Sequence, residues 1–231
     1  MNLERVRHDF LLPVAILLAG ILLAGAIFIV RSQHAIGAAA TNPNAVLPVS
    51  LDDHIIGSPD APVKIVEYAD IDSSYSKQFQ QTMEQIMTEY LAGGKVAWVY
   101  RHFPYAEPDG YGELHAEAAE CAQSISKPAT FYRFIDALNS TAPGENEFNP
   151  NNYDVVVGNL GLSVGSFEQC MNAHTFTGKI AADSTNATQI GASGTPYSVL
   201  LIHGNPPVPI SGALPYAAMK QVIDQSIAKA K

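Results

Sequence analysis

Val63-Lys64-Ile65-Val66-Glu67-Tyr68-Ala69-Asp70 is an apolar run that alternates like a β-strand, and Ser73-Ser74-Tyr75-Ser76 follows it closely. Residues 77–91 then carry apolar side chains at helical spacing. This stretch predicts a strand that turns sharply into the N-terminus of a helix. Backbone N–H groups and the helix dipole at such an end lower the pKa of a cysteine thiol and favour its thiolate. Here the turn carries serine instead of cysteine.

The pattern on either side of this stretch predicts an α/β domain. Residues 95–103 form the next predicted strand, and residues 197–203 and 208–211 form two more around a Gly-Asn-Pro-Pro turn. Residues from about 110 to about 190 have mostly helical periodicity, and residues 214–230 predict a closing helix. The expected order is therefore strand, helix, strand, helices, strand, strand, helix.

Four segments together resemble a DsbA-like thioredoxin-fold domain. Residues 52–68 are similar to the opening of such a domain, residues 95–104 to its next strand, and residues 194–199 to its cis-proline loop. In that family Cys-Pro-aromatic-Cys stands where this chain has Ser73-Ser74-Tyr75-Ser76. The resemblance implies a thioredoxin fold with a helical insertion at about residues 110–190, from a family of thiol–disulfide oxidoreductases.

Ser73 and Ser76 occupy the two positions at which the resemblance implies redox cysteines. A dithiol oxidant needs one thiolate that attacks a disulfide and a second thiol that resolves the mixed disulfide, and a hydroxyl does neither. We therefore expect no catalytic residue here, and we expect one of these vestigial positions, Ser73 or Ser76, to cap the helix. A nucleophilic serine would need an adjacent base, and no signal in the sequence places His54, His102 or His115 there. We expect these histidines to be surface or satisfied structural residues rather than catalysts or metal ligands.

Thr195-Pro196 is the second informative feature, because the resemblance implies a cis proline beside the redox site. X–Pro bonds adopt the cis form far more readily than other peptide bonds, although a simple turn before a strand would also suit proline. Strand-like pairing with an extended peptide needs backbone groups and no thiols. The resemblance therefore implies a peptide-binding site that includes Thr195 and Pro196, and we expect Tyr75 and Tyr197 to line it.

Cys121 and Cys170 are the only cysteines. Both match positions at which some DsbA-like relatives carry a second, structural pair, and an even count in an exported domain favours a disulfide. Such a bond would close a loop of about 50 residues and stabilise the domain by roughly 4 kcal/mol in the chain-entropy model. Two free buried thiols are the alternative.

The N-terminal part of the chain contains a run of 21 residues without a charge, residues 10–30. This run is about long enough to cross a bilayer, and Arg5 and Arg7 before it favour a cytoplasmic N-terminus. A cleaved signal peptide is the alternative, because Ala38-Ala39-Ala40 would suit a cleavage site. We expect a cytoplasmic N-terminus at residues 1–9, a transmembrane signal-anchor at 10–30, a linker at 31–51 and the thioredoxin-fold domain at 52–231.

The net charge of −9 disfavours nucleic acid and anionic lipid as main partners. We expect a single-pass protein of the cell membrane, held through its N-terminal helix, whose C-terminal domain is periplasmic or extracellular. We expect it to bind extended or unfolded polypeptide clients as a non-catalytic holdase or assembly module, without cofactor or metal. One alternative is an envelope disulfide oxidoreductase represented by a Cys-to-Ser variant, and another is a structural envelope domain whose groove has no ligand.

Overall fold

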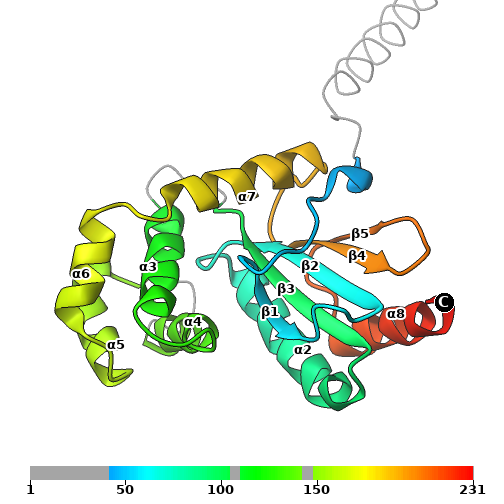
Figure 1. Cartoon of the computed structure of the whole chain (residues 1–231), viewed down its shortest axis with the longest axis horizontal. Helices are drawn as coiled ribbons and strands as arrows, with labels where there is room; N and C mark the ends of the chain where they lie inside the picture. Colours follow the sequence, from blue (N-terminus) through cyan, green and yellow to red (C-terminus); the bar gives the residue numbers. More distant parts are fainter. Residues whose placement is uncertain (1–41, 105–109, 142–147, 231) are drawn as a thin grey trace, which may run out of the picture. The chain divides into compact units, whose positions relative to one another are not determined.

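The strand predicted from the opening stretch, β2 (Val63–Ala69), lies at the centre of a five-stranded sheet with the order β1-β3-β2-β4-β5 (Figure 1). The computed structural model describes residues 42–104, 110–141 and 148–230. Strand β2 pairs in parallel with β3 (Val96–His102) and antiparallel with β4 (Tyr197–Ile202). The edge strands are β1 (His54–Gly57) and β5 (Val208–Ser211). Because β2 is covered on both faces, its sequence is more continuously apolar than that of a half-exposed strand.

Helices cover both faces of the sheet (Figure 1). Helices α2 (Ser74–Tyr90) and α8 (Tyr216–Lys229) bury Phe79, Met83 and Ile223 against one face. Helix α7 (Thr177–Gln189) packs Ala187 on the other face, where Val66 and Val199 lie. This layered arrangement positions the N-terminus of α2 directly after the end of β2.

A group of helices is inserted between β3 and β4, as predicted for about residues 110–190. This helical insertion has its own core of aromatic residues, including Phe131, Phe134 and Phe167, which continues onto Tyr100 of the sheet. A continuous core of this kind couples the insertion to the sheet through apolar packing. The insertion consists of α3 (Gly112–Ser124), α4 (Thr130–Thr141), α5 (Tyr153–Asn159), α6 (Val164–Asn172) and α7, and short 3₁₀ turns lie at Pro43–Ala45, Leu91–Gly93 and Pro150–Asn152.

Helix α2 begins three residues earlier than its apolar periodicity predicted, at Ser74 instead of residue 77. Ser73 is the N-cap, because its side chain accepts a hydrogen bond from the backbone N–H of Ser76. The first turn buries Ser76 and no apolar side chain, so hydrophobic spacing alone does not detect it.

Residues 42–51 do not behave as the linker that the sequence suggested. The guanidinium group of Arg101 donates to the backbone carbonyls of Leu47 and Pro48, at 3.1 and 3.0 Å. The backbone N–H of Leu47 donates to Oδ1 of Asn186 at 3.1 Å. A buried cation and a buried amide thus hold this segment on the domain, and its Ala45, Val46 and Val49 pack against the core.

The predicted cytoplasmic residues 1–9, the predicted membrane span 10–30 and the first part of the predicted linker, residues 31–41, lie outside the described residues. Within the part of the chain that the structure describes, no helix combines the length and the apolar character needed to cross a membrane.

Candidate functional site

The turn between β2 and α2 is organised by Ser73. Its Oγ accepts a hydrogen bond from the N–H of Ser76 at 3.3 Å, and its carbonyl accepts from the N–H of Lys77 at 2.9 Å. The hydroxyl oxygen of Ser76 is buried and has no hydrogen-bond partner among the described residues. Tyr75 projects from the same turn, and 66% of its surface is exposed. The turn is therefore a capped helix N-terminus, and it has hydroxyls at the two positions where the resemblance implies thiols.

The loop before β4 contacts this turn, although the two are far apart in the sequence. The peptide bond between Thr195 and Pro196 is cis, and Oγ of Ser73 donates to the carbonyl of Thr195 at 3.4 Å. The carbonyl of Pro196 accepts from the N–H of Gly212 at 3.0 Å. The serine turn and the cis-proline loop, 122 residues apart in sequence, therefore lie together. We refer to Ser73, Ser76, Tyr75, Thr195 and Pro196 as the serine–proline site.

We expected Tyr197 to line this site, but its side chain lies in the core. It is only 5% exposed, and its hydroxyl donates to the carbonyl of Ile190 at 3.3 Å. The ring packs with Val66 and Ala187 under α7. Side chains alternate along a strand, so the first residue of β4 enters the core beneath α7. Tyr75 remains the exposed aromatic residue of the serine turn.

An aspartate–histidine pair links the residue before the serine turn to the helical insertion. Oδ1 of Asp72 lies 2.6 Å from Nδ1 of His115, and Nε2 of His115 lies 3.1 Å from the carbonyl of Phe148. His115 is fully buried. It thus joins α3 to the residue immediately before Ser73. The sequence contained both residues without a signal that they meet, because they are 43 positions apart.

A buried carboxylic acid lies on β2, where sequence reasoning assigned no function. Glu67 is almost completely buried, and Nε1 of Trp98 donates to its Oε2 at 2.7 Å. Burial in a low-dielectric core raises the pKa of Glu67 to about 8, and the hydrogen bond from Trp98 opposes this shift. The signal was present in the alternation of the strand, because Glu67 occupies the same face as the core residue Ile65.

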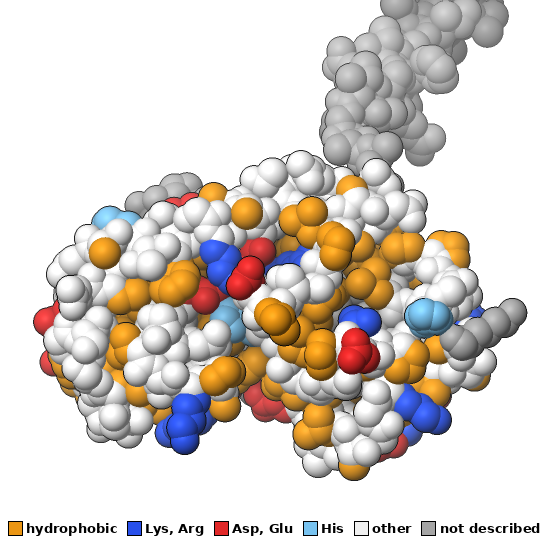
Figure 2. Space-filling view, in the orientation of Figure 1, with side chains coloured by type: hydrophobic (Ala, Val, Ile, Leu, Met, Phe, Trp, Pro, Cys, Tyr) orange, Lys and Arg blue, Asp and Glu red, His pale blue; other side chains and the backbone are white. Residues whose placement is uncertain are grey.

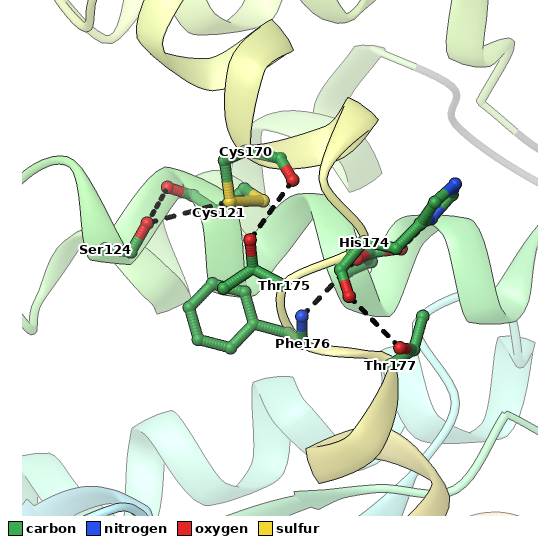
Figure 3. Close-up of a disulfide and its surroundings, with 8 residues drawn as sticks. Cys121, Ser124, Cys170, His174, Thr175, Phe176 and Thr177 are labelled. Carbon is green, nitrogen blue, oxygen red and sulfur yellow. Dashed lines mark hydrogen bonds and ion pairs between the residues drawn. A yellow bond between two sulfur atoms is a disulfide. The ribbon is translucent and has the colours of Figure 1, made fainter.

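Cys121 and Cys170 form a disulfide bond that joins α3 to α6 (Figure 3). Their Cα atoms are 5.8 Å apart, a normal separation for a disulfide. Ser124 lies next to the bond, with its Oγ 3.9 Å from Sγ of Cys170 (Figure 3). Both cysteines lie within helices of the insertion and not at the strand-to-helix turn, so the bond cross-links the insertion.

His54 and His102, which we expected to be surface or satisfied structural residues, are both buried. Each hydrogen-bonds through Nε2 to the same oxygen of Glu120. Nothing in the spacing of these residues predicted the contact, because they come from β1, β3 and α3.

Known proteins with similar sequences fall into two groups. A family model described as "Thioredoxin" matches residues 50–225. A "Na(+)/H(+) antiporter NhaA 3" of Salinispora tropica is 29% identical over 72% of this chain and 24% of its own length. A "Probable disulfide bond formation protein D" of Bacillus cereus is 25% identical over 75% of this chain and 78% of that protein. The chain therefore spans about a quarter of the length of the antiporter that it matches.

The fold is also similar to solved structures. Alpha-DsbA1 of Wolbachia pipientis superposes with a TM-score of 0.69 at 23% identity, over 82% of this chain and 98% of that one. With the observed sheet and helical insertion, this similarity confirms the predicted thioredoxin fold with a helical insertion for the described domain. With the family match over residues 50–225, these findings show that the chain belongs to the thioredoxin family and has the fold of its DsbA-like members.

Proposed function

We propose that this chain is a DsbA-like domain that binds extended polypeptide at the serine–proline site and performs no dithiol exchange there. The observation that carries the proposal is the contact between Oγ of Ser73 and the carbonyl of Thr195, next to the cis proline. This contact brings the serine turn and the cis-proline loop together, and both thiol positions carry hydroxyls.

The chemistry of the site supports binding rather than exchange. The contribution of a helix dipole is on the order of 1 kcal/mol, far too little to ionise a serine hydroxyl near neutral pH. Ser73 is moreover engaged as a helix cap. An extended peptide could instead pair with the backbone of the cis-proline loop, as in other strand-addition complexes. The exposed ring of Tyr75 offers apolar area for a side chain of that peptide.

The Cys121–Cys170 disulfide supports an extracytoplasmic location for the domain, because disulfides persist in oxidising compartments. Residues 10–30 would anchor the protein in the membrane. Clients would then be extended or unfolded polypeptides on the outer side of that membrane, which fits a holdase or assembly role.

A binding experiment with the full chain tests this proposal. We would measure the affinity for a set of unfolded, labelled peptides, and compare Tyr75→Ala with Leu91→Ala, which removes a half-exposed apolar side chain beyond the other end of α2. Pro196→Ala is compared with Pro59→Ala at an exposed turn. We expect weaker binding for the Tyr75 and Pro196 variants and unchanged binding for the two controls. If the native chain binds no peptide, or if all four variants bind equally, the proposal fails.

The second candidate is an envelope thiol–disulfide oxidoreductase of which this sequence is a Cys-to-Ser form. It is favoured by the position of Ser73 and Ser76 at a helix N-terminus, where thiols would be activated, and by the name of the Bacillus relative. We would restore Ser73→Cys/Ser76→Cys and assay oxidative refolding of a reduced protein, with Ser73→Ala/Ser76→Ala as the control. A restored pair that stays inert argues against this candidate, and activity in the unmodified chain would assign the exchange to Cys121 and Cys170.

A further inference from the structure

A buried polar cluster connects the helical insertion to the sheet, apart from the serine–proline site. His54 of β1 and His102 of β3 direct their Nε2 atoms at one oxygen, Oε1 of Glu120 on α3. The two distances are 2.8 and 3.0 Å. The side chains of both histidines are 1% exposed and that of Glu120 is 4% exposed. The two nitrogens and the oxygen all lie within 4.8 Å of one another.

Lys179 of α7 completes the cluster on the side nearest to solvent. Its Nζ lies 2.9 Å from Oε1 of Glu120 and 3.3 Å from Oδ2 of Asp183. The side chain of Lys179 is 23% exposed, so it is the most accessible member of the group. On the face shown in Figure 2, basic, acidic and histidine side chains come together between the helical insertion and the sheet.

This cluster has a net negative charge when both histidines are neutral. Glu120 and Asp183 carry two negative charges, and Lys179 supplies one positive charge. With two neutral imidazoles the sum is therefore −1. A buried charge without compensation is costly. Either a proton on a histidine or a bound cation would neutralise the cluster.

The hydrogen bonds of His54 show where the missing positive charge belongs. Its Nδ1 lies 3.0 Å from Oε1 of Gln123, and its ring stacks on Phe131 with the centroids 3.4 Å apart. When the Nδ1–H group donates to Gln123, the lone pair of Nε2 points at the cluster, in the form that coordinates metals. That lone pair then faces a carboxylate oxygen at 2.8 Å, a contact that is attractive only with a proton or cation between the two atoms.

We propose that His54, His102 and Glu120 bind a divalent transition-metal ion such as zinc, in competition with the ammonium group of Lys179. Two imidazoles and one carboxylate are a ligand set that zinc accepts, with a fourth position left open. Ligand atoms around tetrahedral zinc lie roughly 3.3 Å apart, so the two nitrogen–oxygen distances of 2.8 and 3.0 Å need to open by a few tenths of an ångström. The two nitrogens, which lie within 4.8 Å of one another, would adjust to the same separation. Binding releases the protons held on the ligand nitrogens and moves Lys179 into solvent. The ion is then balanced by Glu120 and Asp183.

A titration of the full chain with Co²⁺, followed by Zn²⁺, tests the proposal. Four-coordinate Co²⁺ absorbs visible light more strongly than hydrated Co²⁺, and the coordination geometry is thus read directly. We expect one Co²⁺ per chain, displaced by Zn²⁺, and a higher unfolding temperature in the presence of either metal. The absence of this spectrum from both the native chain and Lys179→Met would overturn the proposal.

The variants separate this site from other histidines. His54→Gln and His102→Gln should each remove the Co²⁺ spectrum, whereas His203→Gln, at an exposed turn, should retain it. A spectrum that persists in both ligand variants would assign the metal elsewhere, for example to His8 and His34, and would overturn the proposal.

Two further variants keep the test independent of misfolding. Lys179→Met removes the competing ammonium group and should bind Co²⁺ more tightly than the native chain, a gain that a misfolded protein would not show. Gln123→Leu removes the partner of His54 and should weaken binding by about tenfold, the effect typical of residues that orient a metal ligand. Weaker binding by the Lys179 variant would contradict the proposed competition.

Discussion

The N-terminus of α2 and the junction between α3 and α6 differ in the atoms at their key positions. Ser73 and Ser76 carry hydroxyl groups at the N-terminus of α2, whereas Cys121 and Cys170 form a disulfide bond between α3 and α6. A helix N-terminus needs a hydrogen-bond acceptor, which serine supplies as well as any residue. A covalent link between helices needs two thiols, for which serine is no substitute. The comparison shows that the fold at a redox-type turn does not depend on thiol chemistry, whereas the cross-link in the insertion does.

The largest expected effect concerns the insertion. Cys121→Ala/Cys170→Ala should lower the free energy of unfolding by roughly 4 kcal/mol, because the bond closes a loop across a separation of 49 residues. Urea denaturation of both chains under oxidising conditions measures the loss. Ser124→Ala, next to the bond, serves as the control. Equal stability of the double variant and the native chain would show that the insertion does not need its cross-link.

The second-largest expected effect concerns the buried Glu67 in the core beside α2 and the dependence of stability on pH. The pKa of Glu67 is raised from 4.5 to about 8 by burial, so the folded chain binds its proton more tightly than the unfolded chain. Between these two pH values the stability therefore falls as the pH rises. Glu67→Gln should remove a decrease on the order of 2 kcal/mol or more between pH 5 and pH 8. Unfolding free energies at the two pH values provide the measurement, and a decrease of the same size in both chains would contradict the assignment.

The smallest expected effect compares two serine caps, one in each region. Ser73 caps α2 and Ser163 caps α6, and each Oγ accepts from the N–H three residues on at 3.3 Å. Ser73→Ala should cost about 1 kcal/mol of unfolding free energy, and it also removes the contact with Thr195. Ser163→Ala, at an exposed cap, should cost roughly half as much. Thermal unfolding of the two variants ranks the caps, and a Ser73 variant as stable as the native chain would show that the turn does not rely on its cap.

Much of the fold was predictable because its elements have strong local signals. The alternation in residues 63–70 predicted β2, and the observed strand is Val63–Ala69. The helical insertion, expected at about residues 110–190, runs from Gly112 to Gln189. Apolar periodicity detects such elements because burial on one side imposes a fixed spacing. The first turn of α2 has no such spacing, so its start was indicated only by the expected serine cap, which is Ser73.

The candidate site was predictable only in part. The resemblance pointed to Ser73, Ser76 and the Thr195-Pro196 loop, and the structure places them together. We also expected Tyr197 to line the site, but its ring is in the core. The face of a strand on which a side chain lies depends on register, and a shift of one residue reverses it. Motif matching does not resolve that register.

The sequence by itself determined the order of strands and helices, the serines at the turn and the two cysteines available for a bond, because these depend on residue identity and short-range spacing. Tertiary structure decided which distant polar groups meet. Only the packed fold brings His115 to Asp72, Arg101 to residues 47 and 48, and His54, His102 and Lys179 to Glu120. The physical reason is that burial removes water from these groups, so each must find its partner across the fold, at distances along the chain that no local pattern records.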